Sequence, residues 1–178
     1  MPRPSGGIAT ITSVFRSALA IGALAFLTAG SAACASTLEG KVVSVADGDT
    51  LTVLDLQKTT HKIRLAGIDA PEKKQPYGHI SKERLLKRTI GKQVTVEFSK
   101  NDKFGRIVGK ITINGADICL EQVKAGLAWH YKAFEKEQSE RDRQDYSAAE
   151  SHARNQKLGL WRDIDPIPPW EWRKARRR

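Results

Sequence analysis

Cysteine is scarce in this sequence, which holds only Cys34 and Cys119 among its 178 residues. Small disulfide-stapled domains need several bridging pairs, so that class of fold is excluded. Cys119 follows Ile118 in an apolar stretch, a setting typical of a buried core thiol and not of a reactive nucleophile. The four histidines are not paired at a spacing typical of metal ligands, so we read them as core or surface residues.

Apolar runs long enough to span a bilayer are also missing, because the run over residues 17–29 is too short. This run follows Arg3 and Arg16, no acidic residue occurs before Glu39, and the small residues GSAACAS come next. The order of a basic region, an apolar region and a small-residue cleavage site predicts a secretory signal peptide over residues 1–35. We therefore expect a secreted or periplasmic protein.

The cleavage site has more than one candidate. Cleavage after Ala35 is favoured, and cleavage after Ala33 would leave Cys34 at the new N-terminus. A lipid-modified Cys34, and hence a surface-attached lipoprotein, is a weaker alternative because Ser31 stands where a lipoprotein signal usually has leucine. An uncleaved membrane anchor is a further alternative.

Basic residues outnumber acidic ones, 30 Lys and Arg against 20 Asp and Glu, which gives a formal net charge of +10. Removal of the predicted signal peptide takes away two arginines and leaves a formal charge of about +8. Such an excess favours a polyanionic partner such as nucleic acid. The 143 residues that remain are enough for one domain with its own core.

The first half of this domain has the alternation of β-strands. Turn residues Asp47-Gly48-Asp49 separate the first two β-rich runs. The turn signal Asn114-Gly115 ends the last predicted strand of the domain. The predicted strands lie within residues 40–56, 61–68, 92–98 and 105–115. Their apolar faces comprise Ile63 and Leu65, then Val94, Val96 and Phe98, then Ile107, Ile111 and Ile113.

Helices are predicted over residues 79–91, 116–128 and 134–158. Leu86 and Ile90 would form the apolar stripe of the first, and Asp117 is the candidate N-cap of the second. Three prolines predict an extended tail over residues 163–178. Because a short antiparallel sheet must protect its edges, the pattern predicts an α+β domain at 36–162, a small five-stranded OB-like β-barrel with about three helices.

Charged residues gather in three segments that such a barrel would bring to one end: residues 47–50, 64–72 and 101–106. The carboxylates of Asp49 and Asp69 and the backbone carbonyl of Ala70 are the hard oxygen ligands that Ca²⁺ or Mg²⁺ prefers. Three such ligands leave room for water and a phosphate oxygen, and a metal there would polarise the phosphate. The sequence thus indicates a metal site.

The same segments supply the other groups for phosphodiester hydrolysis. Glu72 is placed to orient or deprotonate a water, and Arg64 and Arg106 to bind the phosphate through their planar guanidinium groups. Each segment alone is also consistent with an ordinary charged turn or a solvated strand face. The combination, more than any one part, points to metal-assisted hydrolysis.

Five motifs together resemble the staphylococcal (micrococcal) nuclease, or thermonuclease, family: VADGDTL, IRLAGIDAPE, DKFGRIVG, GLAW and HARNQKLGLW. They run in order from about residue 41 to 161. The resemblance implies an OB-like barrel with three helices and a Ca²⁺-dependent enzyme that cleaves DNA and RNA to products with 3′-phosphates. It also implies roles for six residues: Asp49, Asp69 and Ala70 as metal ligands, Glu72 as general base, and Arg64 and Arg106 as catalytic arginines.

The sequence departs from the family pattern at a few positions. Ala70 stands where threonine is common, which a backbone ligand tolerates, and Phe104 stands where tyrosine is common. The loop after Glu72 is short. The nucleotide-stacking aromatics do not align cleanly, and Lys103 and Tyr131 are the predicted nucleotide contacts.

The alternative function is a noncatalytic OB-type module that binds single-stranded nucleic acid through charge and stacking. Retention of all the carboxylates and arginines named above argues against it. Trp161, Trp170 and Trp172 either anchor the C-terminal tail on the barrel, which we favour, or stack on bases. We expect the basic run RKARRR to attract nucleic acid loosely, and we expect a monomer.

Overall fold

The computed structural model describes residues 36–176. These residues belong to one compact unit. The predicted signal peptide over residues 1–35 and its cleavage sites lie outside the described residues. Within 36–176, no helix combines the length and the apolar character that crossing a membrane requires.

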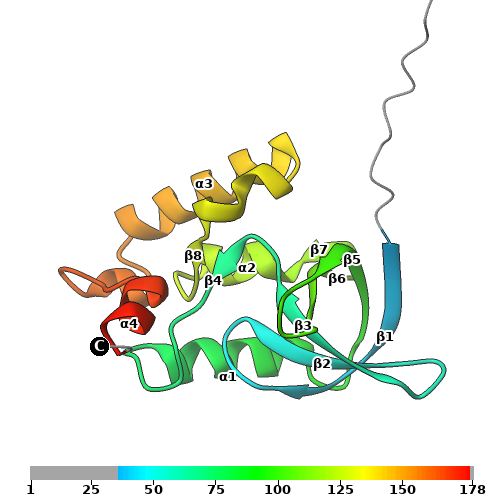
Figure 1. The fold of residues 1–178 in the computed structure, drawn as a ribbon. Coiled ribbons are helices and arrows are strands. Elements are labelled where there is room, and N and C mark those ends of the chain that lie inside the picture. The colour runs from blue at the N-terminus through cyan, green and yellow to red at the C-terminus, as the bar shows by residue number, and fades with distance from the viewer. Residues whose placement is uncertain (1–35, 177–178) are drawn as a thin grey trace, which may run out of the picture. The chain divides into compact units, whose positions relative to one another are not determined.

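A closed β-barrel forms the core of this unit (Figure 1). Neighbouring strands pair in the order β3-β2-β1-β5-β6, all antiparallel, and a parallel pairing of β3 with β6 closes the barrel. The predicted five-stranded OB-like barrel is therefore confirmed. Its strands are β1 (Ser36–Val45), β2 (Thr50–Asp55), β3 (Thr60–Leu65), β5 (Gln93–Asn101) and β6 (Ile107–Ile113).

Strand β1 serves two neighbours because it coils at Gly40. Residues 36–41 pair with β5, and residues 40–45 pair with β2. A Cβ atom at Gly40 would lie 2.4 Å from the carbonyl oxygen of Leu54, so only glycine allows this close approach. The same strand can thus pass from one side of the barrel to the other without breaking its ladders.

The barrel interior is filled by the predicted apolar faces, since strand side chains alternate between the two sides. Gly109 interrupts the row on β6 because a Cβ there would lie 2.5 Å from Cγ1 of Val96. Phe98 is partly buried and packs at the edge of this core. The buried side chains include Leu51, Val53, Ile63, Leu65, Val94, Val96, Ile107, Ile111 and Ile113.

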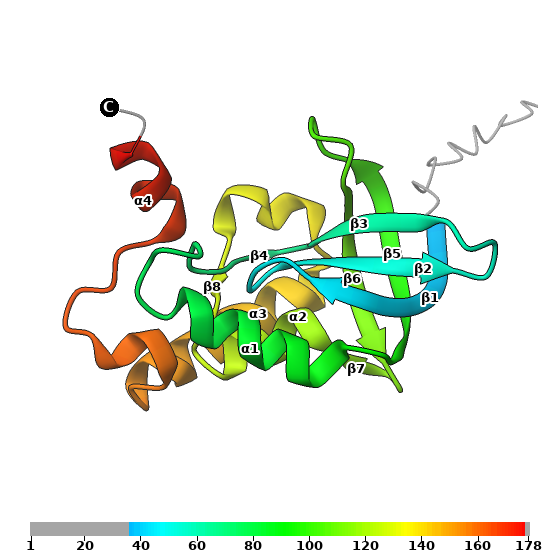
Figure 2. The ribbon, with the colours of Figure 1, turned by 90° about the horizontal axis from the view of Figure 1, so that it is seen from below.

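Helices and short strands pack beside the barrel, with α2 between α3 and α1 and with α4 beyond the β4–β8 pair (Figures 1 and 2). The helical elements are α1 (Gly78–Thr89), α2 (Ile118–Lys124), η1 (Lys132–Glu137), α3 (Glu140–Asn155), η2 (Gly159–Arg162) and α4 (Pro169–Ala175). The short strands are β4 (Ile68–Asp69), β7 (Ala116–Asp117) and β8 (Trp129–His130).

The apolar stripe predicted for α1 was wrong at Ile90 but right at Leu86, which is partly buried against the core. Ile90 lies beyond the helix and is 42% exposed, while Ser81, Leu85 and Thr89 are fully buried. The two hydroxyls can be buried because each has a partner: Ser81 Oγ donates to the carbonyl of Leu127 at 2.7 Å, and Thr89 Oγ1 to that of Leu85 at 2.7 Å. An apolar pattern alone does not reveal such satisfied polar residues.

The predicted cap of α2 is confirmed, and the single helix predicted over residues 134–158 was wrong. Asp117 accepts a hydrogen bond from the backbone nitrogen of Leu120. The segment that follows β8 is a 3₁₀ helix, η1, and α3 begins separately after Ser139, whose hydroxyl accepts from the backbone nitrogen of Asp142. This serine cap lets the chain change direction between the two helices.

The C-terminal tail was predicted to be extended, and this was also wrong for residues 169–175, which form α4. Pro169 occupies the start of the helix, where proline is tolerated because its missing N–H would have no partner. Trp170 packs edge-on against Trp129 at 5.5 Å and stacks on Tyr131 at 5.4 Å between ring centroids. The prediction that tryptophan anchors the tail is confirmed for Trp170.

Candidate active site

All eight predicted site residues line one cavity of about 810 Å³ at the end of the barrel where β1 turns into β2 and β3 leads into β4. Closure of the barrel brings these turns together, as the sequence indicated. The eight residues are Asp49, Arg64, Asp69, Ala70, Glu72, Lys103, Arg106 and Tyr131.

Asp49 is fixed by the turn between β1 and β2. Its backbone nitrogen donates to the side chain of Asp47 at 3.1 Å, and its Oδ2 accepts from the backbone nitrogen of Ala70 at 2.7 Å. Gly48 is required beside it, since a Cβ there would lie 2.0 Å from Oγ of Ser81. The turn and the end of β4 are thereby held in one arrangement.

Arg64 lies between the two buried aspartates. Its Nη1 is 3.1 Å from Oδ2 of Asp49, and its Nη2 donates to Oδ1 of Asp69 at 2.8 Å. Burial raises the pKa of Asp49 to about 7, and the carboxylates of Asp47 and Asp69 add to this rise against the opposing effect of Arg64. Burial therefore disfavours the charged form of Asp49, and the neighbouring Arg64 offsets part of this cost.

Glu72 projects from the turn that precedes α1 and is half-buried. Its backbone nitrogen donates to the side chain of Gln75 at 3.1 Å, and the backbone nitrogen of Gln75 donates back to its carbonyl at 2.8 Å. Gly78 packs against the same carbonyl, because a Cβ there would lie 2.0 Å from it. The backbone of Glu72 is thus rigid while its carboxylate faces the cavity.

Arg106 lines the cavity from the turn between β5 and β6, where Asp102 holds it. Its Nε and Nη2 each lie 2.7 Å from Oδ2 of Asp102. Burial opposes ionisation of Asp102, but these bonds and those from the backbone of Phe104 and Arg106 lower its pKa overall. Asp102 is a positioning residue that the sequence reasoning missed, although the D-x-x-x-R spacing over a glycine turn was a usable signal.

The predicted nucleotide contacts lie at the rim of the cavity among aromatic side chains. Lys103 is exposed and lies 5.2 Å from the ring centroid of Phe104, while Tyr131 lies 5.2 Å from that of Phe134. Phe104 is 70% exposed and Phe134 46% exposed. Exposed rings next to cations are the features that bind single-stranded nucleic acid by stacking and charge.

Arg173, from α4, was not predicted and lies inside the site. Its Nη2 donates to Oδ2 of Asp69 at 2.8 Å, and its Nη1 donates to Oε1 of Glu72 at 2.8 Å and to Oδ1 of Asp69 at 3.2 Å. Residues 69 and 173 are 104 positions apart. The two prolines before Trp170 signal a helix start, but nothing local places Arg173 on these carboxylates.

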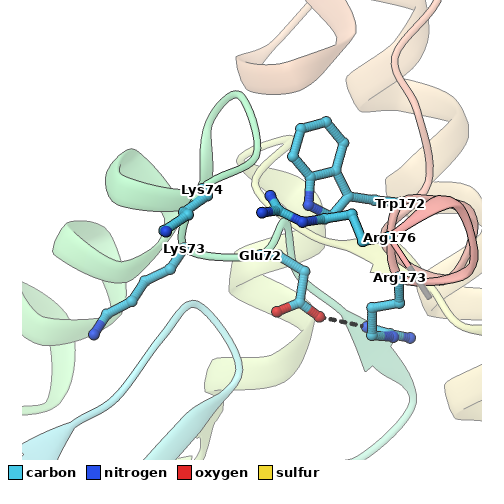
Figure 3. A pocket seen from close by; sticks show the side chains of 6 residues that line it. All are labelled: Glu72, Lys73, Lys74, Trp172, Arg173 and Arg176. Atoms are coloured by element: carbon cyan, nitrogen blue, oxygen red, sulfur yellow. Dashed lines mark hydrogen bonds and ion pairs between the residues drawn. The ribbon is translucent and has the colours of Figure 1, made fainter. Parts of the chain in front are cut away.

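A second, open hollow of about 280 Å³ adjoins Glu72 (Figure 3). Figure 3 shows lysines of the loop before α1 on one side and α4 on the other, with Glu72 between them. We call it the α4 pocket; its lining is Glu72, Lys73, Lys74, Trp172, Arg173 and Arg176.

The donor atoms fit a hard divalent cation. The carboxylates of Asp49 and Asp69 converge within reach of Arg64, and the carbonyl of Ala70 belongs to the same buried turn. Residues 36–176 contain no cluster of three or more His, Cys, Asp or Glu side chains arranged to hold a metal. A metal here would have two carboxylates and a backbone oxygen, and water or phosphate would complete its shell.

Comparison with known proteins agrees with this geometry. The family model described as "Staphylococcal nuclease homologue" matches residues 62–163. The chain belongs to this family. Membership of the family supports a nuclease, an enzyme that hydrolyses nucleic acid. Seven of the eight predicted site residues fall inside the matched range, and Asp49 precedes it.

Relatives of this nuclease family member occur in bacteria and plants. An Escherichia coli protein named "Uncharacterized endonuclease" is 42% identical over 137 residues, which cover 76% of this chain and 85% of the relative. A Haemophilus influenzae protein of the same name is 37% identical over 75% of this chain and 72% of its own length. The "Staphylococcal-like nuclease CAN1" of Arabidopsis thaliana is 43% identical over 65% of this chain and 34% of its own length.

Proposed function

We propose that this chain is an exported, monomeric, Ca²⁺-dependent nuclease that cleaves DNA and RNA to products with 3′-phosphates. The single observation that carries the proposal is the cluster of Asp49, Arg64, Asp69 and Glu72 around one cavity. Family membership supports the nuclease assignment. The basic charge of the chain suits a polyanionic substrate.

Asp49, Asp69 and the carbonyl of Ala70 would hold the cation. When bound, Ca²⁺ would offset the negative charge of the scissile phosphate and polarise it. Glu72 accepts a proton from the attacking water, since its carboxylate faces the cavity and its backbone is rigid.

The arginines stabilise the charge that develops on the phosphate. Arg64 donates to it from the floor of the cavity, and Arg106 from the turn that Asp102 supports. The oxygen of the attacking water bonds to phosphorus as the bond to the 5′ oxygen breaks. The phosphate stays on the 3′ oxygen of one fragment, and the 5′ oxygen takes a proton from solvent and leaves as the hydroxyl of the other.

The rim of the cavity suits both DNA and RNA. Tyr131, Phe104 and Phe134 offer flat faces to bases, and Lys103 attracts the backbone. Stacking and charge do not depend on the sugar, because every base has a π face and every linkage a phosphate. We therefore expect little discrimination between the two nucleic acids.

The deciding experiment incubates purified protein that begins at residue 36 with plasmid DNA and with RNA, in Ca²⁺ and in excess chelator. We expect cleavage of both substrates in Ca²⁺ and none in chelator. Binding without cleavage in Ca²⁺ would show the noncatalytic module instead, and equal cleavage in chelator would contradict the metal requirement.

The general-base role has its own test in Glu72→Gln. We expect kcat to fall by about two to four orders of magnitude, the usual contribution of general-base catalysis, with nucleic-acid affinity retained. Lys87→Gln, at an exposed position on α1, is the control. An unchanged kcat in Glu72→Gln would remove Glu72 from the mechanism.

A further inference from the structure

Arg173 is the cation that joins Asp69 to Glu72 in this structure, while Arg64 also bonds to Asp69. The guanidinium of Arg173 makes three hydrogen bonds of 2.8–3.2 Å to the carboxylates of Asp69 and Glu72, and both oxygens of Asp69 take part. The side chain of Asp69 is 1% exposed, whereas that of Arg173 is 36% exposed. The buried partner is therefore fixed, and the arginine is the group that can leave.

A divalent cation on Asp69 would compete with this contact. Oδ1 of Asp69 already accepts from both Arg64 and Arg173, and Oδ2 accepts from Arg173. A guanidinium and a dication repel each other when they share one carboxylate, most strongly where water is excluded. Occupation of Asp69 by a metal therefore weakens its bonds to Arg173.

Contacts other than those to the carboxylates also hold α4. Trp170 packs on Trp129 and Tyr131, Pro169 is buried, and the side chain of Gln75 donates to the carbonyl of Ile167. The guanidinium can change partners while the helix stays where it is.

The α4 pocket is the neighbouring space open to the released guanidinium. Apart from Glu72 its polar lining is cationic, and Lys73, Lys74 and Arg176 pair with no carboxylate within the part of the chain that the structure describes. Trp172 adds an aromatic face, 5.7 Å from the guanidinium of Arg176. Cations beside an indole form a site for a phosphate and base of a nucleic-acid strand.

We propose that Arg173 is an exchangeable cation: it binds Asp69 and Glu72 in the metal-free protein, yields Asp69 to the divalent cation, and then binds a backbone phosphate of the substrate in the α4 pocket. This inference rests on the proposed function. The exchange does not involve a proton: burial lowers the pKa of Arg173, but its bonds to Asp69 and Glu72 outweigh this and raise it. Arg173 therefore weakens the binding of the divalent cation and strengthens the binding of the nucleic acid.

The first test is a calorimetric titration of Ca²⁺ without nucleic acid. We expect Arg173→Gln to bind Ca²⁺ about ten-fold more tightly than the wild-type protein, because hydrogen bonds to a charged group no longer have to be broken. Arg173→Lys keeps the charge without the bidentate geometry, so its Ca²⁺ affinity should lie between those of the wild-type and Arg173→Gln proteins. Lys174→Gln is the matched control, since Lys174 is an exposed cation on the same helix, and its affinity should be unchanged.

The second test measures binding of a short single-stranded phosphorothioate oligonucleotide at saturating Ca²⁺, by fluorescence anisotropy. Here we expect Arg173→Gln to bind several-fold more weakly, roughly the effect of one lost charge-assisted contact, and Lys174→Gln to bind nearly as the wild type does. Circular dichroism melting of each variant checks that α4 and the barrel remain folded.

The outcomes separate this inference from the proposed function. Equal Ca²⁺ affinity of the wild-type and Arg173→Gln proteins overturns the exchange and leaves the nuclease proposal intact. Oligonucleotide binding that is unchanged or tighter in Arg173→Gln overturns the phosphate-binding step. Absence of Ca²⁺ binding to both proteins overturns the metal assignment of the proposed function and the exchange together.

Discussion

Arg64 is, at the scale of one residue, the cation shared by the two carboxylates assigned to the metal. It lies between two carboxylates whose residues are 6% and 1% exposed, and it bonds to both. A buried charge that loses its partner is strongly destabilising, because its desolvation is no longer offset. The arginine assigned to bind phosphate therefore also supports the fold.

This double role predicts the effect of Arg64→Ala on stability. We expect the free energy of unfolding in chelator to fall by about 3 kcal/mol, the order observed when one partner of a buried pair is removed. Urea denaturation followed by fluorescence measures the change, and added Ca²⁺ should restore part of it because a bound ligand stabilises the folded state.

Arg141→Ala is the control for this prediction. Arg141 is 90% exposed and lies 3.7 Å from Asp145 on the surface of α3, so its loss should cost little. Equal losses in the two variants would contradict a supporting role for Arg64.

Between elements, a bidentate ion pair joins α1 to α2. Nε of Arg88 donates to Oε2 of Glu121 at 2.7 Å, and Nη2 donates to Oε1 at 3.0 Å. The hydrogen bond from Arg88 is the main reason that the pKa of Glu121 is lowered. Both helices also contact Gly48 in the turn that carries Asp49. The side chain of Gln122 on α2 donates to the carbonyl of Gly48, and Ser81 on α1 packs against this glycine.

The lowered pKa predicts a pH-dependent difference between the wild type and Glu121→Gln. A carboxylate with a lowered folded-state pKa stabilises the protein above its ordinary value, 4.5 for Glu121, and this stabilisation is lost as the pH falls through the lowered value. We expect Glu121→Gln to lose about 1 kcal/mol at neutral pH, the upper range for an exposed pair of good geometry.

Chemical denaturation at neutral and acidic pH tests this expectation. The two stabilities should converge as the pH falls below the lowered pKa of Glu121, since protonated Glu121 resembles glutamine. A difference that stays constant across this range would assign the loss to packing instead of charge.

For the whole molecule, charge is the dominant property. The segment after residue 35 carries a formal charge of about +8, and lysines and arginines predominate among the charged residues of the α4 pocket. Association with nucleic acid releases condensed counterions from the phosphates, so affinity falls with salt in proportion to the number of phosphates contacted.

This charge predicts a steep salt dependence. We expect KM for single-stranded DNA to rise strongly between low and moderate salt at saturating Ca²⁺, while kcat changes little. Steady-state kinetics over a series of NaCl concentrations gives the slope of log KM against log salt. Arg173→Gln should reduce this slope by about one unit, the contribution of one phosphate contact. A slope near zero in the wild-type protein would contradict binding through the backbone phosphates.

The barrel and most of the cavity were predictable because their signals are local. Alternation of Val94 and Val96, the cap at Asp117 and the turn at Asp47 to Asp49 follow from strand geometry and short-range hydrogen bonds. Closure of the barrel then brings the three charged turns together. Three of the five family motifs, VADGDTL, IRLAGIDAPE and DKFGRIVG, accordingly supply residues that line the cavity.

The tertiary structure alone decided the conformation and role of the C-terminal segment. A seven-residue helix has little stability by itself, and α4 forms where Trp170 finds the surface of Trp129 and Tyr131. By itself, then, the sequence determined the barrel, the charged turns and the chemistry they favour. Only long-range packing placed Arg173 on Asp69, because that contact depends on how a distant helix docks and not on any pattern along the chain.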